Sequence, residues 1–325
     1  MVSIIYRRTY FIGVLLLLAT CVPRCNCDAI STLTSPPRGW RSWNQMGPNI
    51  NQSQMLAIAE AMVDRSRLVD GKPTSLLDLG FNRIGMDDNW QACGTGINGS
   101  FHSASGEPLW NMTRFPDVKA MNDKIHNLGL YTDWYINNCI CPEKGKLRPG
   151  FADAGNAKAL PVLGFDGVKI DGCGPDRNVT RFAQMVDAVA EGRIITIEDC
   201  NDDPNWDRGS TDVSHFYETG CAVSGGGFYR IGGDIFGYWQ AVVDRIQGMA
   251  GHERPVPWHT PLQRPGCWPT PDALEVGCTR QGPLGLNFTE SRSHFGMWVV
   301  TSSPLILGLD LRDKKAVDFS WFVVL

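Results

Sequence analysis

The sequence has no long block of charge of one sign, and beyond its N-terminus it has no apolar run long enough to cross a bilayer. Its formal net charge at pH 7 is −4, so nothing in it is typical of a surface for nucleic acid or for an anionic membrane. Internal repeats and low-complexity stretches are also absent. What remains is a chain of 325 residues, 43% of them hydrophobic, which is enough for one large core or two ordinary ones.

The N-terminus has the pattern of a secretory signal. Arg7 and Arg8 precede an apolar run over residues 11–19, which is short for a transmembrane helix but suits the central region of a signal peptide. We predict a signal peptide over residues 1–27, with cleavage after Cys21 or after Cys27, and a mature chain over residues 28–325. We expect the mature chain in the secretory pathway, secreted or in a lysosome or vacuole, without membrane association.

Cysteine usage agrees with an oxidising compartment. Three of the 11 cysteines lie in or beside the signal, and the remaining even number predicts up to four disulfides. Zinc is the alternative, but Cys139 and Cys141 have no second close pair to complete a site, so we predict no metal. Five Asn-x-Ser/Thr sequences fit a glycoprotein, and they begin at Asn51, Asn98, Asn111, Asn178 and Asn287.

Short apolar runs alternate with segments of helical period, which is the pattern of βα units and a parallel sheet. Eight such runs predict a (β/α)8 TIM barrel, with a doubly wound sheet as the alternative. A barrel requires its functional side chains to follow the carboxyl ends of the strands. The eight candidate strands cover residues 39–43, 81–86, 130–136, 167–170, 193–197, 213–217, 255–258 and 305–309.

Two aspartates have the surroundings that glycosidic bond cleavage needs, namely two carboxyl groups across the reacting carbon. Strand alternation places Lys169 and Asp171 on one face, where the cation keeps the carboxylate ionised as a nucleophile requires. The alternative is a structural Asp171 that caps a turn before Gly172.

Asp234 is the second candidate, because Gly232 and Gly233 let a substrate approach closely and Arg230 can donate to a hydroxyl. An aspartate after two glycines is also an ordinary turn residue.

Six motifs occur in an order that resembles the alpha-galactosidase or melibiase family, glycoside hydrolase family 27 of clan D. They are GWRSWN (39–44), MDDNW (86–90), VKIDGC (168–173), RIGGDI (230–235), PDAL (271–274) and SPL followed by DLR (303–305 and 310–312). The resemblance spans residues 37–312, nearly the whole mature chain. It implies a (β/α)8 catalytic barrel, and a retaining hydrolase that releases terminal α-linked galactose without metal or organic cofactor.

The resemblance assigns roles residue by residue. Asp171 matches the nucleophile of the family and Asp234 matches its acid/base. For Asp87 and Asp88, which match the pair that grips distal hydroxyls of galactose, a metal site is the rival interpretation. The residues implied to bind substrate are Trp43, Asp87, Asp88, Tyr135, Lys169, Arg230 and Asp272.

The family pattern also implies disulfides. It joins Cys200 to Cys221 and Cys267 to Cys278, and it joins Cys173 to Cys139 or Cys141 with the other left for Cys93. Of the two choices we take Cys141–Cys173 and Cys93–Cys139.

Three departures bear on specificity and completeness. Asn201 and Asp202 stand where the family reads the group on sugar carbon 2, and residues 224–227 are inserted before Arg230. The chain ends at Leu325, before the last barrel helix and the antiparallel β domain of the family, so we expect a C-terminally truncated barrel.

Several functions therefore stay open besides an alpha-galactosidase. They are an alpha-N-acetylgalactosaminidase, a beta-L-arabinopyranosidase, a sugar-binding barrel without turnover, and an unstable fragment. The expected partner is a small carbohydrate or glycoconjugate, with no nucleic acid, and a homodimer is left open.

Overall fold

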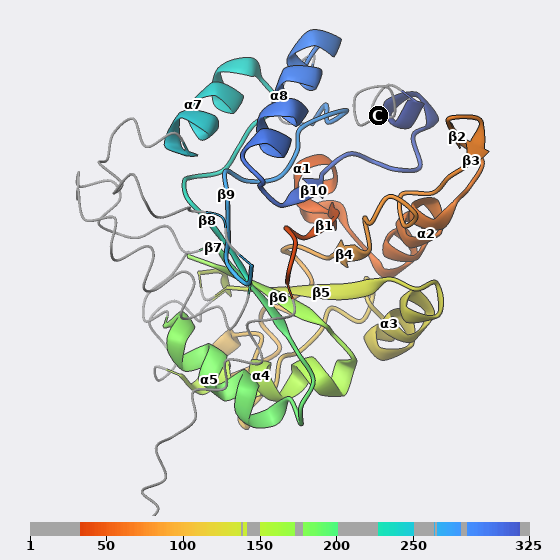
Figure 1. The fold of residues 1–325 in the computed structure, drawn as a ribbon. Helices are drawn as coiled ribbons and strands as arrows, with labels where there is room; N and C mark the ends of the chain where they lie inside the picture. The colour runs from red at the N-terminus through yellow and green to blue at the C-terminus, as the bar shows by residue number, and fades with distance from the viewer. Residues whose placement is uncertain are drawn as a thin grey trace, which may run out of the picture.

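A computed structural model describes residues 33–137, 139–141, 150–172, 178–200, 227–249, 263, 265–280 and 285–318. Eight parallel strands form one curled sheet with helices on its outside (Figure 1). The strands are β1 (Arg38–Arg41), β4 (Arg83–Gly85), β5 (Tyr131–Ile136), β6 (Gly167–Asp171), β7 (Thr196–Cys200), β8 (Phe228–Arg230), β9 (Trp268–Thr270) and β10 (Leu305–Leu307). A separate two-stranded antiparallel hairpin joins β2 (Leu68–Val69) to β3 (Lys72–Pro73).

Around the sheet, strand order follows chain order, and each neighbouring pair is parallel. The two edges also meet, because the Leu274 N–H donates to the Ile306 carbonyl at 2.7 Å and Leu274 forms a parallel bridge with Leu307 of β10. A doubly wound sheet reverses its strand order at a switch point. This sheet does not, so the (β/α)8 barrel prediction is confirmed.

The helices lie between successive strands. They are α1 (Trp43–Met46), α2 (Gln52–Val63), α3 (Val118–Asn127), α4 (Phe151–Leu163), α5 (Val179–Val189), α7 (Trp239–Met249) and α8 (Phe288–Val300), with short 3₁₀ turns at Gly47–Asn49 and Ile97–Gly99. None of the described helices is long and apolar enough to span a membrane.

Side-chain caps explain where several of these helices begin. The Asn51 and Asp117 side chains accept from backbone N–H groups in the first turns of α2 and α3. Asn178 does the same for α5, and Asn287 forms a capping box with Glu290 at α8. Each cap satisfies an N–H that the helix leaves without a partner, which contributes about 1 kcal/mol. The caps therefore fix the residues at which these four helices begin.

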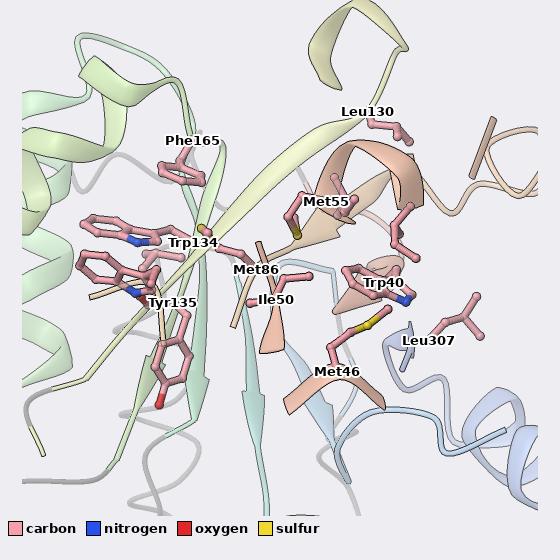
Figure 2. Close-up of a cluster of buried hydrophobic side chains, with 14 of the residues drawn as sticks. Trp40, Met46, Ile50, Met55, Met86, Leu130, Trp134, Tyr135, Phe165 and Leu307 are labelled. Carbon is pink, nitrogen blue, oxygen red and sulfur yellow. The ribbon is translucent and has the colours of Figure 1, made fainter. Parts of the chain in front are cut away.

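The core lies between the sheet and its helices and is rich in aromatic rings. Trp134 of β5 stacks on Phe165 with ring centroids 5.5 Å apart and planes 7° from parallel (Figure 2). Trp90 packs on Trp134 from the loop after β4 and donates its ring N–H to the Tyr135 carbonyl at 2.8 Å. These rings are fully buried. They hold β4, β5 and the following loops in fixed register below the polar end of the barrel.

Three strands differ from the expected positions. The fifth barrel strand, β7, lies three residues beyond the expected 193–197. The sixth and seventh barrel strands are β8 and β9, at Phe228–Arg230 and Trp268–Thr270. The expected strands 213–217 and 255–258 lie outside the described residues, as do the signal region 1–27 and residues 319–325.

The predicted disulfides need correction. Cys93 is bonded to Cys141, with Cα atoms 5.6 Å apart, which is an ordinary span for a disulfide. The pairings Cys93–Cys139 and Cys141–Cys173 are therefore wrong, although Cys139 is itself disulfide-bonded.

The other two predicted pairings are wrong as well, because Cys200 and Cys278 are buried free thiols. The Cys278 thiol packs 3.9 Å from the Leu274 carbonyl, inside the barrel wall. Cys267 is disulfide-bonded, but not to Cys278. Cys173 and Cys221 lie outside the described residues.

Candidate active site

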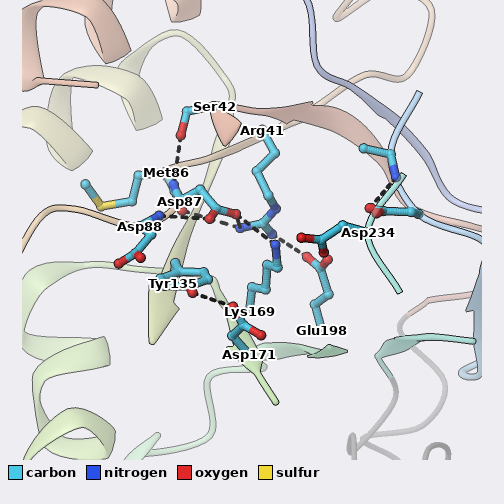
Figure 3. Close-up of polar contacts among 12 residues, drawn as sticks. Arg41, Ser42, Met86, Asp87, Asp88, Tyr135, Lys169, Asp171, Glu198 and Asp234 are labelled. Atoms are coloured by element: carbon cyan, nitrogen blue, oxygen red, sulfur yellow. Dashed lines mark hydrogen bonds and ion pairs between the residues drawn. The ribbon is translucent and has the colours of Figure 1, made fainter. Parts of the chain in front are cut away.

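The predicted site residues gather at the carboxyl ends of the strands (Figure 3). This is the end at which TIM barrels place their reactive groups. The contributing elements, with the residues that each supplies, are the loop after β4 (Asp87, Asp88), β5 (Tyr135), β6 (Lys169, Asp171), β8 (Arg230), the loop after β8 (Asp234) and the loop after β9 (Asp272). A cavity of about 620 Å³ lies at the other end, beside Arg38 and Tyr131 at the strand beginnings, and none of the predicted site residues lines it.

Asp87 is held from several directions and is only 2% exposed. The Lys169 ammonium donates to its Oδ2 at 2.9 Å. The Asp88 N–H donates to its Oδ1 at 2.8 Å, and its own N–H donates to the Ser42 hydroxyl at 2.9 Å. The residue is therefore fixed in place by contacts with three separate groups.

Asp88 stands at the edge of this group, where Oδ1 accepts from Gln91 Nε2 at 2.8 Å and from Asn137 Nδ2 at 3.3 Å. Burial raises the pKa of Asp88, and the nearby charges of Asp87 and Asp171 act in the same direction. Within the described ranges, no group of three or more His, Cys, Asp or Glu side chains is arranged to hold a metal ion. Asp88 is thus a half-buried acceptor beside the buried Asp87.

Tyr135 and Asp171 form the next pair. The Tyr135 hydroxyl donates to Asp171 Oδ2 at 2.5 Å, and Asn137 Nδ2 donates to the same hydroxyl oxygen at 3.1 Å. Burial and the adjacent carboxylates raise the pKa of Tyr135 well above its usual value. The phenol therefore stays protonated and acts as a fixed donor to Asp171.

A second group lies beyond β8. Arg230 donates to Asp234 Oδ1 at 2.5 Å, and the same nitrogen lies 3.7 Å from Asp272 Oδ2. The Arg230 side chain is 5% exposed, whereas that of Asp234 is 55% exposed. Asp234 is thus open to solvent but tethered by a buried cation, and in Figure 3 its carboxylate points toward the side that holds Glu198.

Asp272 holds an unusual backbone conformation, with φ at 109°, a region that residues with a side chain rarely adopt. Its carboxylate accepts from the N–H groups of Ile235 at 2.8 Å and Ala273 at 2.6 Å. The Trp298 ring N–H donates to its carbonyl at 2.8 Å. These three bonds stabilise the strained turn and connect it to the loop that carries Asp234.

Trp43 begins α1 directly after β1 and is half-buried. Its ring faces the Arg280 guanidinium, 5.3 Å from the ring centre. No hydrogen bond or ring contact joins the Trp43 side chain to the other predicted site residues, all of which lie in the described part of the chain.

Sequence reasoning noted Glu198 as a polar residue at a strand end without giving it a role, and it did not identify Arg41. The structure places both among the site residues. Arg41 of β1 donates to Glu198 Oε2 of β7 and lies 4.0 Å from Asp87 Oδ2. Burial raises the pKa of Glu198, which the charges of Arg41 and Lys169 only partly offset. The available signal was a charged residue within each of two barrel strands, at positions where a purely structural strand is apolar.

The family model described as alpha galactosidase A (Melibiase_2) matches residues 35–320. The chain belongs to this family. Alpha-galactosidase 2 of Arabidopsis thaliana is 29% identical over 296 residues, which cover 88% of this chain and 63% of that protein. The alpha-galactosidase of Cyamopsis tetragonoloba is 30% identical over 291 residues, which cover 86% of this chain and 59% of that one. The chain therefore spans about three-fifths of the length of these curated relatives.

A solved structure agrees in fold. Alpha-galactosidase I from Mortierella vinacea superposes with a TM-score of 0.66 at 22% identity, covering 90% of this chain and 72% of that chain. At this identity the likeness supports the barrel alone, and the chemistry has to be argued from the residues of this melibiase-family chain.

Proposed function

We propose that the chain is a retaining glycoside hydrolase that releases terminal α-linked D-galactose from oligosaccharides or glycoconjugates. One observation carries the proposal. Asp171 and Asp234, on separate strand–loop units, stand at the same end of the barrel, and each has its own buried partner, Tyr135 or Arg230. A site for binding alone does not need two carboxylates held in this way.

In the proposed reaction, Asp171 attacks the anomeric carbon while Asp234 transfers its proton to the departing glycosidic oxygen. The bond from carbon to the leaving group breaks as the bond to the Asp171 carboxylate forms. Asp234, now ionised, takes a proton from water as that water displaces Asp171 from the sugar. The sugar leaves with its original anomeric configuration, and both carboxyl groups return to their starting states.

The remaining predicted residues bind the sugar in this proposal. Asp87 and Asp88 accept hydrogen bonds from hydroxyls on the side away from the bond that breaks, and Lys169 donates there. Arg230 and Asp272 hold the 2-hydroxyl side together with Asp234. Trp43 offers its ring to an apolar sugar face, and Tyr135 contributes through Asp171.

The experiment compares hydrolysis of para-nitrophenyl α-D-galactopyranoside by the purified chain and its Asp171→Asn variant at mildly acidic pH. Asp123→Asn is the matched control, because it removes an exposed carboxylate on α3 whose partner is Lys119. Activity that Asp171→Asn loses and Asp123→Asn keeps supports the proposal, and proton NMR of the first-formed sugar tests retention. A folded wild-type chain without turnover contradicts it.

Parallel assays with the N-acetyl-α-D-galactosaminide and the β-L-arabinopyranoside test the two alternative activities. They are needed because Asn201 and Asp202, which bear on carbon 2, lie outside the described residues. Binding of galactose without hydrolysis of any of the three would identify a sugar-binding barrel.

The proposed setting of the enzyme is the secretory pathway, with residues 1–27 as the signal peptide. The Cys93–Cys141 disulfide supports an oxidising compartment. N-terminal sequencing of the secreted chain tests the cleavage site, and a mobility shift after glycosidase treatment tests glycosylation.

A further inference from the structure

Four charged side chains from separate strands or strand ends meet at the centre of the candidate site (Figure 3). Two are cations, Arg41 of β1 and Lys169 of β6, and two are carboxylates, Asp87 after β4 and Glu198 of β7. Their side chains are only 3% to 12% exposed. Among these four groups the charges balance.

Both cations approach the same oxygen atom. Lys169 Nζ lies 2.9 Å from Asp87 Oδ2, and Arg41 Nη1 lies 4.0 Å from it. The other terminal nitrogen of Arg41 donates to Glu198 Oε2. Glu198 is also the register neighbour of Lys169 across β6 and β7, so its charge attracts both cations.

We propose that Glu198 is a positioning residue that holds Arg41 away from Asp87 and so preserves the Lys169–Asp87 pair for the sugar. This inference rests on the proposed function, in which that pair binds sugar hydroxyls. Glu198 acts through Arg41 and is not itself a group that reacts.

The relative strength of the two cations as carboxylate partners supports this role. A guanidinium presents a planar fork that fits both oxygens of a carboxylate, whereas an ammonium is a point charge. Without Glu198, the hydrogen bond that Arg41 keeps within the described residues is the long one from Nη1 to the Met86 carbonyl, at 3.4 Å, so Arg41 can turn onto Asp87 and displace Lys169. Asp87 would then lose the acceptor position that sugar hydroxyls need.

A purely stabilising role explains the arrangement less well. Taking ions out of water costs free energy that a buried pair recovers only with good geometry, and apolar residues of similar volume often do as well. The Arg41 Nε is buried with no hydrogen-bond partner in the part of the chain that the structure describes. The buried ion pairs therefore recover only part of the free energy lost when these charges leave water. We infer that their value lies in orienting the groups that bind the sugar.

The test measures D-galactose affinity by titration calorimetry for the wild-type chain, Glu198→Gln and the double variant Arg41→Met/Glu198→Gln. Glu198→Gln keeps an oxygen for Arg41 but removes the charge, and we expect affinity to fall about tenfold. The double variant removes the cation that would displace Lys169 and leaves one cation and one carboxylate, so we expect most of the affinity to return. Asp153→Asn, which breaks the Arg181 pair outside the barrel, is the control.

All chains are compared at a temperature at which each is folded, so recovery in the double variant reports the state of the Lys169–Asp87 pair and not a change in stability. A folded Glu198→Gln chain that binds as tightly as wild type overturns the proposal, as does a double variant weaker than the single one. Should Glu198→Gln fail to fold, the double variant, with its balanced charges, decides: affinity near wild type supports the proposal, and a tenfold or greater loss overturns it. A wild-type chain that binds no galactose contradicts the proposed function instead.

Discussion

The Tyr135 hydroxyl donates a 2.5 Å hydrogen bond to Asp171 Oδ2, from β5 to the last residue of β6. The two residues lie on adjacent parallel strands, where Tyr135 is the register partner of Lys169. Because the pKa of the buried Tyr135 is raised, the phenol donates throughout the physiological pH range. The bond fixes which oxygen of Asp171 is occupied and leaves Oδ1 for other contacts.

We predict that Tyr135→Phe lowers kcat about tenfold, because it removes one charge-assisted donor from the proposed nucleophile. Hydrolysis of the nitrophenyl galactoside measures the effect, and Tyr131→Phe, at an exposed position on the same strand, is the control. An unchanged kcat in folded Tyr135→Phe would show that the bond does not serve the reaction.

The next prediction concerns a carboxyl group that lies behind the site. Glu275 is fully buried, receives a hydrogen bond from Asn44, and has an Oε2 with no partner among the described residues. Burial raises its pKa to about 7 from an ordinary 4.5. Between these values the folded chain keeps a proton that the unfolded chain releases. Its contribution to stability is therefore full below pH 4.5 and is lost as pH rises to 7.

We predict that Glu275→Gln, which is neutral at every pH and keeps an acceptor for Asn44, removes this loss. The free energy of unfolding of the wild type, measured in denaturant at pH 4.5 and pH 8, should fall by roughly 3 kcal/mol more than that of the variant. His294, whose Nε2 accepts from the Glu275 N–H, has a pKa lowered by burial to about 3 and opposes the trend below pH 6.5. It remains in both proteins, so the comparison isolates Glu275. Parallel stability curves would contradict the prediction.

The predicted strands 130–136 and 167–170 match β5 and β6, whereas the predicted strand 193–197 shares only residues 196 and 197 with β7. Sequence periodicity missed β8 and β9, which are three residues each, and β9 contains Pro269. A proline is rare inside a strand, so the local signal pointed elsewhere. Length alone does not separate the two groups, because β4 and β10 are also three residues each and lie inside the predicted strands 81–86 and 305–309.

The residues of the candidate site also fall into two groups, those that local sequence reveals and those that it does not. Asp171 and Asp234 sit in short motifs that local sequence reveals, together with Lys169 and Arg230. The contact between Arg41 and Glu198 joins residues 157 positions apart, and no local pattern records such a contact. The choice between Cys139 and Cys141 was wrong for a related reason, since the two are equivalent in sequence and only the structure pairs Cys141 with Cys93.

We predict that the Cys93–Cys141 bond appears as one linked peptide when the unreduced chain is denatured, alkylated and digested. Cys200 and Cys278 should carry the alkyl group, because both are free thiols. A linked peptide of Cys267 and Cys278 would restore the family pairing instead. Replacing Cys93 and Cys141 together by serine should cost about 2–4 kcal/mol of stability, since the bond closes a long loop.

The final prediction concerns the orientation of the exposed Asp234 carboxylate, which the buried Arg230 guanidinium holds in place. A single Arg230 nitrogen lies within 4 Å of both Asp234 and Asp272. Arg230→Lys keeps the positive charge but replaces the planar guanidinium with an ammonium on a flexible chain. The Asp234 carboxylate would then no longer be held in a fixed orientation toward the glycosidic oxygen. We expect kcat/KM to fall at least tenfold while thermal stability changes little. Arg181→Lys, which alters a similar pair on the outside of the barrel, should leave kcat/KM unchanged. If the two variants lose activity equally, Asp234 is not oriented by Arg230, and its position depends on the loop after β8 alone.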